Sequence, residues 1–314
     1  MQEIATECLA ADAAGIERAA GHLRAGRLVA FPTETVYGLG ADASNDLAVA
    51  GIFEAKGRPS FNPLIVHVPD VDAAKTLVEW SDTAERAARF WPGPLTLVLP
   101  RKPDAQVSRL VSAGMETVAV RIPQAPVAQA LLRAFGGPVA APSANPSGLI
   151  SPTLADHVLI GLSGKIAAVL DGGACTMGLE STILGLAGRP TLLRPGGITL
   201  ETLTEALGTP VAQRHDSETI SAPGQLSSHY APRAQVRLNA AEFEPGEARL
   251  GFGQMDCDLN LSRDEDLTEA AANLFAYLHQ LDATGADVIA VAPVPHFGLG
   301  IAINDRLSRA AAER

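Results

Sequence analysis

The sequence predicts an α/β protein, with a mixed, twisted sheet in its first part and a small βαβ unit in its second. Short apolar runs typical of buried strands interleave with segments of helical periodicity. Two closely spaced strands, 181–186 and 191–193, flank the turn-forming residues 187–190, which indicates an antiparallel hairpin. A purely parallel sheet is therefore not expected.

The individual elements follow from the same patterns along the chain. In the first part we expect helices at residues 12–25, 46–55, 70–78, 82–90, 126–135, 153–160 and 199–207. Besides the hairpin, strands are expected at residues 28–31, 64–68, 95–99, 117–122, 139–141 and 167–170. The second part is predicted to hold strands at 248–252 and 287–292 and helices at 266–283 and near 304–313.

A long linker is expected between the two parts. Residues 208–235 lack apolar periodicity and are rich in Pro, Gly and Ser. We therefore divide the chain into a first domain at 1–207, a linker at 208–235 and a C-terminal domain at 236–314.

Composition and charge narrow the class of protein. The chain has 314 residues, of which 47 % are hydrophobic, and a formal net charge of −11. No apolar run approaches the roughly 20 residues of a membrane helix, and the N-terminus carries acids where a signal peptide needs basic residues. We expect a cytoplasmic protein without membrane association. The acidic balance argues against tight, non-specific binding of nucleic acid.

Several familiar motifs are missing from the sequence. It contains no G-x-x-x-x-G-K-[ST] phosphate loop and no G-x-S-x-G nucleophile motif. The three cysteines, Cys8, Cys175 and Cys257, are too scattered to predict a disulfide framework or a metal site. Residues 38–43 (GLGADA) mimic a dinucleotide-binding motif, but they do not directly link a predicted strand to a helix. Residues 298–300 (GLG) are interpreted as a turn.

One stretch, residues 28–67, combines several groups suited to an anionic ligand. Thr33 follows its first strand, Lys56 and Arg58 follow its helix, and His67 lies on its second strand. Hydroxyls, cations and a histidine at these positions can face one crevice, which suits an anionic small molecule. The two cations can equally complement the helix dipole, and a lone histidine on an apolar strand is more often a hydrogen-bonded core residue.

Further polar residues lie at the ends of other strands. Ser143 and Asn145 follow a strand, in a segment that could also be an ordinary turn. Thr117 and Arg121 lie four residues apart on one predicted strand, and hence on one face of it. Because a lone arginine is expensive to bury, Arg121 is expected to have an anionic partner or ligand.

Taken together, these groups are rich in hydroxyls and cations and poor in acid–base pairs. Ser181 and Arg194 add a hydroxyl and a cation at the hairpin. Such a site is suited to positioning a substrate and neutralising its charge, as adenylyl and phosphoryl transfer require.

The same segments resemble those of the L-threonylcarbamoyladenylate synthases, the YrdC-like family, in its long two-domain form. The matching segments are FPTETVYGLG (31–40), KGRPSFNPLIVH (56–67), WPGPLTLVL (91–99), VAVRIP (118–123), APSANPSG (141–148), LDGG (170–173), ESTI (180–183) and LRPGG (193–197). Ser-His-Tyr-Ala-Pro (228–232) resembles the linker motif of the long form.

The resemblance implies an open, twisted α/β fold with a large concave cavity and a small Rossmann-like C-terminal domain. It also implies a reaction in which L-threonine, bicarbonate and ATP, with the Mg²⁺ that ATP carries, give L-threonylcarbamoyl-AMP and pyrophosphate. A partner complex, the tRNA threonylcarbamoyl transferase, would then modify adenosine 37 of ANN-decoding tRNAs. The chain itself is not expected to bind nucleic acid stably.

The family's functional positions carry over residue by residue. On the threonine and bicarbonate side they fall on Thr33, His67, Arg121 and Ser181. On the ATP side they fall on Lys56, Arg58, Ser60, Thr117, Ser143, Asn145, Ser151, Arg194 and Tyr230. Lys56 and Arg58 would be catalytic by stabilising charge on the phosphates, and Tyr230 of the linker would fold over the cavity to exclude water.

Two other functions remain open from the residues. A carbamoyl-adenylate-forming maturation enzyme resembles the same fold, but such chains usually carry an acylphosphatase-like region and zinc-finger cysteine pairs. A non-enzymatic RNA-binding module could use the concave face, although the acidic balance weakens that alternative.

Overall fold

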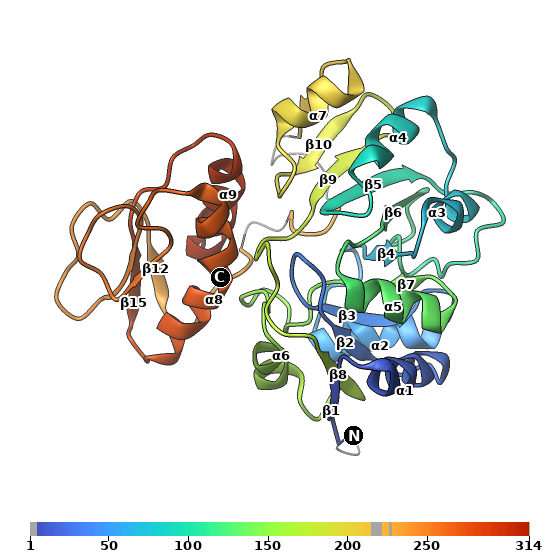
Figure 1. The fold of residues 1–314 in the computed structure, drawn as a ribbon, viewed down its shortest axis with the longest axis horizontal. Helices are drawn as coiled ribbons and strands as arrows, with labels where there is room; N and C mark the ends of the chain where they lie inside the picture. Colours follow the sequence, from blue (N-terminus) through green and yellow to red (C-terminus); the bar gives the residue numbers. More distant parts are fainter. Residues whose placement is uncertain (1–4, 215–221, 226–227, 314) are drawn as a thin grey trace.

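The computed structural model describes residues 5–214, 222–225 and 228–313. Within them the strands form two sheets, a large mixed one and a small parallel one (Figure 1). The large sheet runs, in spatial order, β1 (Glu7–Ala10), β8 (Ala168–Asp171), β2 (Val29–Phe31), β3 (Gly38–Asp42), β7 (Val139–Ala140), β4 (Ile65–His67), β6 (Thr117–Arg121), β5 (Leu95–Pro100), β9 (Thr182–Gly185), β10 (Thr191–Arg194) and β11 (Ala212–Gln213). The predicted antiparallel hairpin is confirmed as β9 and β10.

Helices cover the large sheet on both faces. They are α1 (Ala13–Arg24), α2 (Asp46–Lys56), α3 (Val71–Leu77), α4 (Asp82–Ala87) with the 3-10 turn η1 (Ala88–Phe90), α5 (Pro126–Phe135), α6 (Ala155–Leu162) and α7 (Leu200–Leu207). Each lies where the periodicity predicts it, with ends shifted by no more than a few residues. Local chemistry sets several ends: Asp12, Asn45 and Ser81 cap α1, α2 and α4 through their side chains.

Helices cover one face of the large sheet more fully than the other, which leaves room for a pocket on the less covered face. One face packs against α2, α3, α4, α6 and α7 in a single apolar core. On the other face, α1 and α5 cover only the half that contains β1, β8, β2, β3 and β7. Strand alternation sends Val118 and Val120 of β6 into the first core and leaves Ala119 and Arg121 on the other face, where helices do not cover it.

The C-terminal part forms its own sheet, with all described strands parallel. Their order is β12 (Gln235–Arg237), β15 (Val288–Val291), β13 (Ala248–Gly251) and β14 (Leu259–Asn260). The helices α8 (Leu267–Ala283) and α9 (Leu299–Ala311) lie between this small sheet and the first part of the chain (Figure 1). The predicted fold class, a mixed α/β sheet followed by a small Rossmann-like unit, is confirmed.

Several elements differ from the sequence-based expectation. Residues 38–42, which mimic a dinucleotide motif, form a strand between β2 and β7 rather than a phosphate-binding turn. A Cβ atom on Gly40 would lie 2.9 Å from the Phe31 ring, so a glycine is needed there for packing. The last helix begins at Leu299, not near 304. Gly300 lies in its first turn, and a glycine is needed there because a Cβ atom would clash with Pro295 O.

The short strands β1, β11, β12 and β14 were not expected from the sequence. β11 and the first residue of β12 fall within the predicted linker. Its residues 215–221 and 226–227 lie outside the described part of the chain, and the predicted domain bounds stay a prediction. Among the described residues, none of the helices combines the length and apolar character needed to cross a membrane.

Candidate active site

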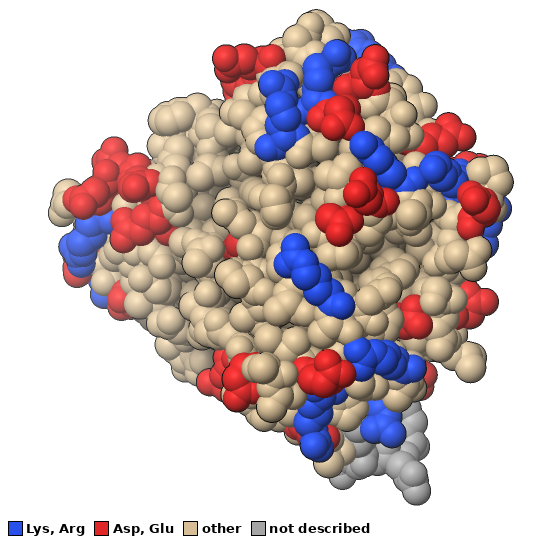
Figure 2. Space-filling view, turned by 45° about the vertical axis from the view of Figure 1, so that its right-hand side comes forward, with Lys and Arg blue, Asp and Glu red and all other residues tan. Residues whose placement is uncertain are grey.

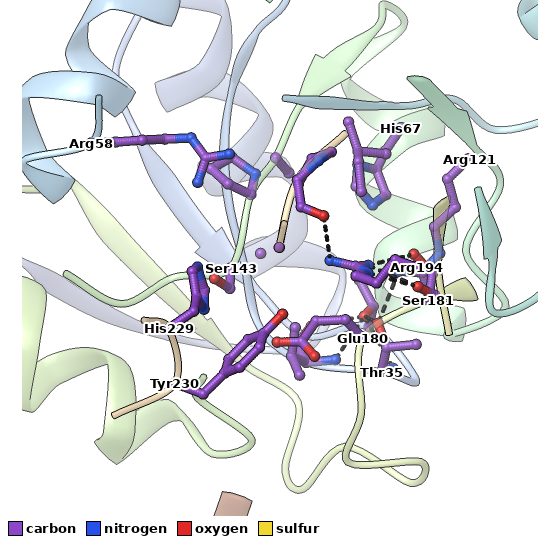
Figure 3. A pocket seen from close by; sticks show the side chains of 18 residues that line it. Thr35, Arg58, His67, Arg121, Ser143, Glu180, Ser181, Arg194, His229 and Tyr230 are labelled. Carbon is purple, nitrogen blue, oxygen red and sulfur yellow. Dashed lines mark hydrogen bonds between the residues drawn. The ribbon is translucent and has the colours of Figure 1, made fainter. Parts of the chain in front are cut away.

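A polar pocket opens on the sheet face that α1 and α5 cover only in part (Figure 3). It contains about 520 Å³ of space between its atoms, including its opening. Eight of the residues that the sequence singles out line it: Thr33, Arg58, His67, Arg121, Ser143, Ser181, Arg194 and Tyr230. Six separate strand ends, the end of α2 and the segment before the small sheet thus meet at one place, although the chain between them spans nearly 200 residues.

Arg121 has an anionic partner, as expected, but the partner is a side chain of the protein. Its Nη2 donates to Glu34 Oε1 at 2.6 Å and its Nη1 donates to Thr35 Oγ1 at 2.8 Å. The second Glu34 oxygen accepts backbone N–H groups of Gln124 and Ala125. Burial alone would raise the pKa of Glu34, but the attraction of Arg121 and these hydrogen bonds outweigh it and lower that pKa. This buried pair is locally neutral.

Thr33 and His67 lie next to this pair. The Thr33 hydroxyl donates to Val36 O at 2.7 Å and accepts the Val36 N–H, so it fixes the turn between β2 and β3. Burial, and then the nearby charge of Arg121, lower the pKa of His67 to about 3, so His67 is neutral at physiological pH. Its Nδ1 is buried and finds no hydrogen-bond partner among the described residues.

Arg58 and the segment after β7 form another side of the pocket. Gly57 ends α2 in the left-handed conformation, with φ of 60°, which lets Lys56 stay on the helix while Arg58 turns into the pocket. Lys56 Nζ donates to Ser143 O at 2.7 Å and to Asn145 O, so the two motifs are joined directly. Burial, and then the charge of Arg58, lower the pKa of Lys56.

Arg58 and Arg194 are buried cations without a carboxylate partner within ion-pair distance among the described residues. Arg58, 8 % exposed, donates to Asn62 O and Pro63 O. Arg194, 5 % exposed, donates to the carbonyl and hydroxyl oxygens of Ser181 at 2.8 and 3.2 Å. Glu180 attracts Arg194 without pairing with it, so this side of the pocket presents positive charge that is only partly offset by local side chains.

Glu180 and His229 line the pocket as well, although neither was predicted from the sequence to be a functional residue. Glu180 accepts a hydrogen bond from Ser151 Oγ at 2.5 Å and pairs with Arg306 at 2.8 Å. Both residues could have been found from the motifs that contain them. Glu180 immediately precedes Ser181 in the motif ESTI, and His229 lies in the linker motif Ser-His-Tyr-Ala-Pro. Arg306 lies outside every motif.

The remaining predicted residues lie behind or away from the pocket wall. Lys56, Asn145 and Ser151 are buried next to residues that line it. Ser60 is exposed on the loop after Arg58, and Thr117 is at the far end of β6, four residues or about 13 Å from Arg121 along the strand. Their contacts with ATP stay predictions.

Several buried polar atoms around the pocket lack a hydrogen-bond partner in the part of the chain that the structure describes. They are His67 Nδ1, Asn145 Oδ1, His229 Nδ1 and Tyr230 Oη. Native proteins rarely leave such atoms unpaired, so their concentration here indicates a site for a polar ligand. Burial, and then the charges of Arg58 and Lys56, lower the pKa of His229, which keeps it neutral.

No group of three or more His, Cys, Asp or Glu side chains suited to holding a metal ion occurs among the described residues. On the face shown in Figure 2, basic and acidic side chains are interspersed rather than gathered by sign. The buried cations Arg58 and Arg194 lie in the pocket wall, which favours a small anionic ligand there.

Two family models match consecutive parts of the chain and together span most of it. A family model described as "Telomere recombination" (Sua5_yciO_yrdC) matches residues 22–196, and one described as "Threonylcarbamoyl-AMP synthase, C-terminal domain" matches residues 198–312. The chain is 43 % identical to the threonylcarbamoyl-AMP synthase of Pyrococcus abyssi, over 95 % of this chain and 94 % of that protein. It is 44 % identical to that of Bacillus subtilis, over 95 % and 93 % of the two chains.

A solved structure agrees with these relatives. The crystal structure of P. abyssi Sua5 complexed with L-threonine superposes with a TM-score of 0.89 at 41 % identity, and the match covers 98 % of this chain and 97 % of that one.

Proposed function

Since the chain belongs to the threonylcarbamoyl-AMP synthase family and is an enzyme of that class, we propose that its substrates are L-threonine, bicarbonate and ATP. The products are L-threonylcarbamoyl-AMP and pyrophosphate. The observation that carries this proposal is the charge of the pocket: Arg58 and Arg194 are buried without a carboxylate partner among the described residues. Such cations are stabilised by a polyanion, and ATP supplies one.

We assign the amino-acid side of the pocket to Thr33, His67, Arg121 and Ser181. The neutral Arg121–Glu34 pair suits a zwitterion, because threonine brings one carboxylate and one ammonium group. Its carboxylate would take a donor of Arg121. Neutral His67 offers an unpaired Nδ1 to a polar group of threonine or bicarbonate.

We assign the nucleotide side to the groups around the uncompensated cations. They are Lys56, Arg58, Ser60, Thr117, Ser143, Asn145, Ser151, Arg194 and Tyr230. Mg²⁺ arrives as part of the substrate MgATP, and the unpaired Oδ1 of Asn145 is a suitable oxygen for it or for its water shell.

In the mechanism we propose, bicarbonate loses hydroxide to give CO₂, the neutral amine of threonine forms an N–C bond to that carbon, and the amine proton leaves with the hydroxide as water, which gives a carbamate. A carbamate oxygen then attacks the α-phosphorus of ATP, the bond from that phosphorus to the β-phosphate oxygen breaks, and pyrophosphate leaves. Arg58 and Lys56 stabilise the charge that develops on the phosphates, as electrostatic catalysis requires. Tyr230 covers the pocket and keeps water from the labile mixed anhydride.

The product then passes to a tRNA threonylcarbamoyl transferase complex in the cytoplasm, which modifies adenosine 37 of ANN-decoding tRNAs. The net charge of −11, with acidic and basic side chains interspersed on the face shown in Figure 2, supports transfer of a small molecule rather than stable binding of tRNA by this chain.

The test is pyrophosphate release from ATP with bicarbonate and each of the twenty amino acids in turn. We expect stimulation by L-threonine alone, and its loss when bicarbonate is removed from the buffer. Release that does not depend on the amino acid, or stimulation by an amino acid other than threonine, would overturn the proposal.

A further inference from the structure

Arg306 of α9 is fully buried, although it belongs to the C-terminal domain and lies outside every motif of the first part. A buried guanidinium is costly unless its donors are satisfied. Its Nε donates to Glu180 Oε2 at 2.8 Å, its Nη2 to Pro195 O at 2.9 Å and its Nη1 to Asp305 Oδ2 at 2.6 Å. Two of these three partners belong to the first part of the chain.

The two partners lie directly at the pocket. Glu180 lines it, and its two carboxylate oxygens are held by different parts of the chain, Oε1 by Ser151 and Oε2 by Arg306. Pro195 follows Arg194, which also lines the pocket. Arg306 therefore fixes two neighbouring segments of the pocket wall from outside the large sheet.

Arg306 also contacts Tyr230 of the linker. Its Cζ lies 5.3 Å from the centroid of the Tyr230 ring, in a cation–π arrangement, and Phe275 of α8 packs on the same ring at 5.4 Å. Tyr230 has a φ of 63°, a left-handed backbone conformation that is rare and strained for a tyrosine, so it costs free energy. Contacts around the ring must offset this cost, and both helices of the C-terminal domain supply them.

The backbone on either side of Tyr230 is held in the same way. The His229 N–H donates to Arg309 O of α9 at 3.1 Å, and the Ala231 N–H donates to Gly148 O of the first part at 2.8 Å. The Tyr230 hydroxyl faces the pocket (Figure 3).

We propose that Arg306 is a positioning residue of the active site, through which the C-terminal domain holds Glu180 and Tyr230 in place on the pocket wall. It acts through these two residues and does not itself line the pocket. In this role the C-terminal domain completes the site rather than only stabilising the chain.

Electrostatics supports the same arrangement. The charged and titratable groups around Glu180 are Arg306 and Asp305 on α9, Arg194 on β10, and Tyr230. Burial alone would raise the pKa of Glu180, but the attraction of Arg306 and then of Arg194 lowers it below its usual range. Without Arg306, Glu180 takes up a proton at higher pH.

The first test rests on the proposed function and compares Arg306→Ala, Arg306→Lys and Asn304→Ala. Asn304 is the matched control, because it lies on the same helix and, among the described residues, its amide donates to Val294, Pro295 and Gly300, which all belong to the C-terminal domain. We expect kcat/KM for ATP to fall about 10- to 100-fold in Arg306→Ala, to recover partly in Arg306→Lys and to stay within about twofold in Asn304→Ala.

The acidic limb of the pH–rate profile should move to higher pH in Arg306→Ala and return in Arg306→Lys. The double variant Arg306→Ala with Glu180→Gln should have a kcat/KM only slightly below that of Arg306→Ala, because both substitutions disrupt the same contact between Arg306 and Glu180. Equal kcat/KM and equal pH profiles in Arg306→Ala and Asn304→Ala would overturn the inference.

A second measurement does not need turnover. Hydrogen exchange of the linker amides at 229–231 should be at least about tenfold faster in Arg306→Ala than in the unsubstituted protein, and unchanged in Asn304→Ala. Unchanged exchange in Arg306→Ala would overturn the role of Arg306. Absence of threonine-dependent turnover in the unsubstituted protein would instead overturn the proposed function, and the exchange experiment would then decide on Arg306 alone.

Discussion

The two sides of the pocket carry similar cations but differ in what neutralises them. On the side of β2 and β6, Arg121 is paired with Glu34 at 2.6 Å, so that wall is close to neutral. On the side of α2 and β10, Arg58 and Arg194 donate only to carbonyl and hydroxyl oxygens among the described residues. A zwitterionic amino acid suits the first wall and a polyanionic nucleotide suits the second. The charge balance of each wall thus indicates the charge of its substrate.

The largest effect is expected from removing an uncompensated cation. Arg58→Ala should reduce threonine-dependent pyrophosphate release by at least about 10³-fold, because an arginine that neutralises transferring phosphates contributes on that order. The fold should stay intact, since Arg58 takes part in no ion pair among the described residues. Steady-state kinetics with far-UV circular dichroism check both expectations, and near-normal turnover would contradict the role of this wall.

A change on the neutral wall should act differently. Glu34→Gln leaves Arg121 buried with an uncompensated charge, so we expect a loss of roughly 3 kcal/mol in the free energy of unfolding. The KM for threonine should rise about tenfold while the KM for ATP stays within about twofold. Denaturant unfolding and substrate titrations measure these quantities. An equal rise in both KM values would remove the distinction between the walls.

His67 should make the stability of this wall depend on pH. Its pKa is about 3 in the folded protein, mainly through burial and then through Arg121, and about 6.5 when unfolded. Between these values the unfolded chain binds more protons, so stability falls as the pH is lowered below about 6.5. We expect a loss on the order of 2 kcal/mol between pH 7 and pH 5 from this residue.

Unfolding of His67→Gln should show a shallower pH dependence over this range. It should not become flat, because the pKa values of His157, His229 and His279 are lowered by burial as well. An unchanged slope in His67→Gln would show that His67 is not the neutral, buried group described here.

The smallest effect is expected at the hydroxyl of Tyr230, which lines the pocket. Tyr230→Phe keeps the ring on Arg306 and Phe275 and removes only Oη, which has no hydrogen-bond partner among the described residues. The unfolding midpoint should not change, whereas the KM for ATP should rise about fivefold, equivalent to one hydrogen bond of about 1 kcal/mol. A drop in thermal stability would place the hydroxyl in the protein's own hydrogen bonding.

The sequence predicted the groups of the pocket better than it predicted their partners. Thr33, His67 and Arg121 follow from strand ends and strand alternation, because these are local patterns. The pairing of Arg121 with Glu34 joins residues 87 apart, and that of Arg306 with Glu180 joins residues 126 apart. No local periodicity encodes which carboxylate meets which arginine, since the first pairing depends on the strand order of the large sheet and the second on how the C-terminal part packs against it.

In the fold, too, the elements with clear local patterns were predicted better than those without. Helices with clear periodicity and caps lie where they were expected, whereas the short strands β1, β11, β12 and β14 were missed and the glycine-rich β3 was not recognised as a strand. Gly40 is required by close contacts with Phe31 and Val139 on the two adjacent strands, and Gly300 by the carbonyl of Pro295 just before its helix.

The central claim is that this pocket joins threonine, bicarbonate and ATP into one mixed anhydride. Mass spectrometry of the product formed from ¹³C-labelled bicarbonate, L-threonine and ATP tests it directly. We predict L-threonylcarbamoyl-AMP with one labelled carbon, formed in equal amount to the pyrophosphate released. Pyrophosphate without a labelled nucleotide product, or a product whose carbamoyl carbon is unlabelled, would contradict the account.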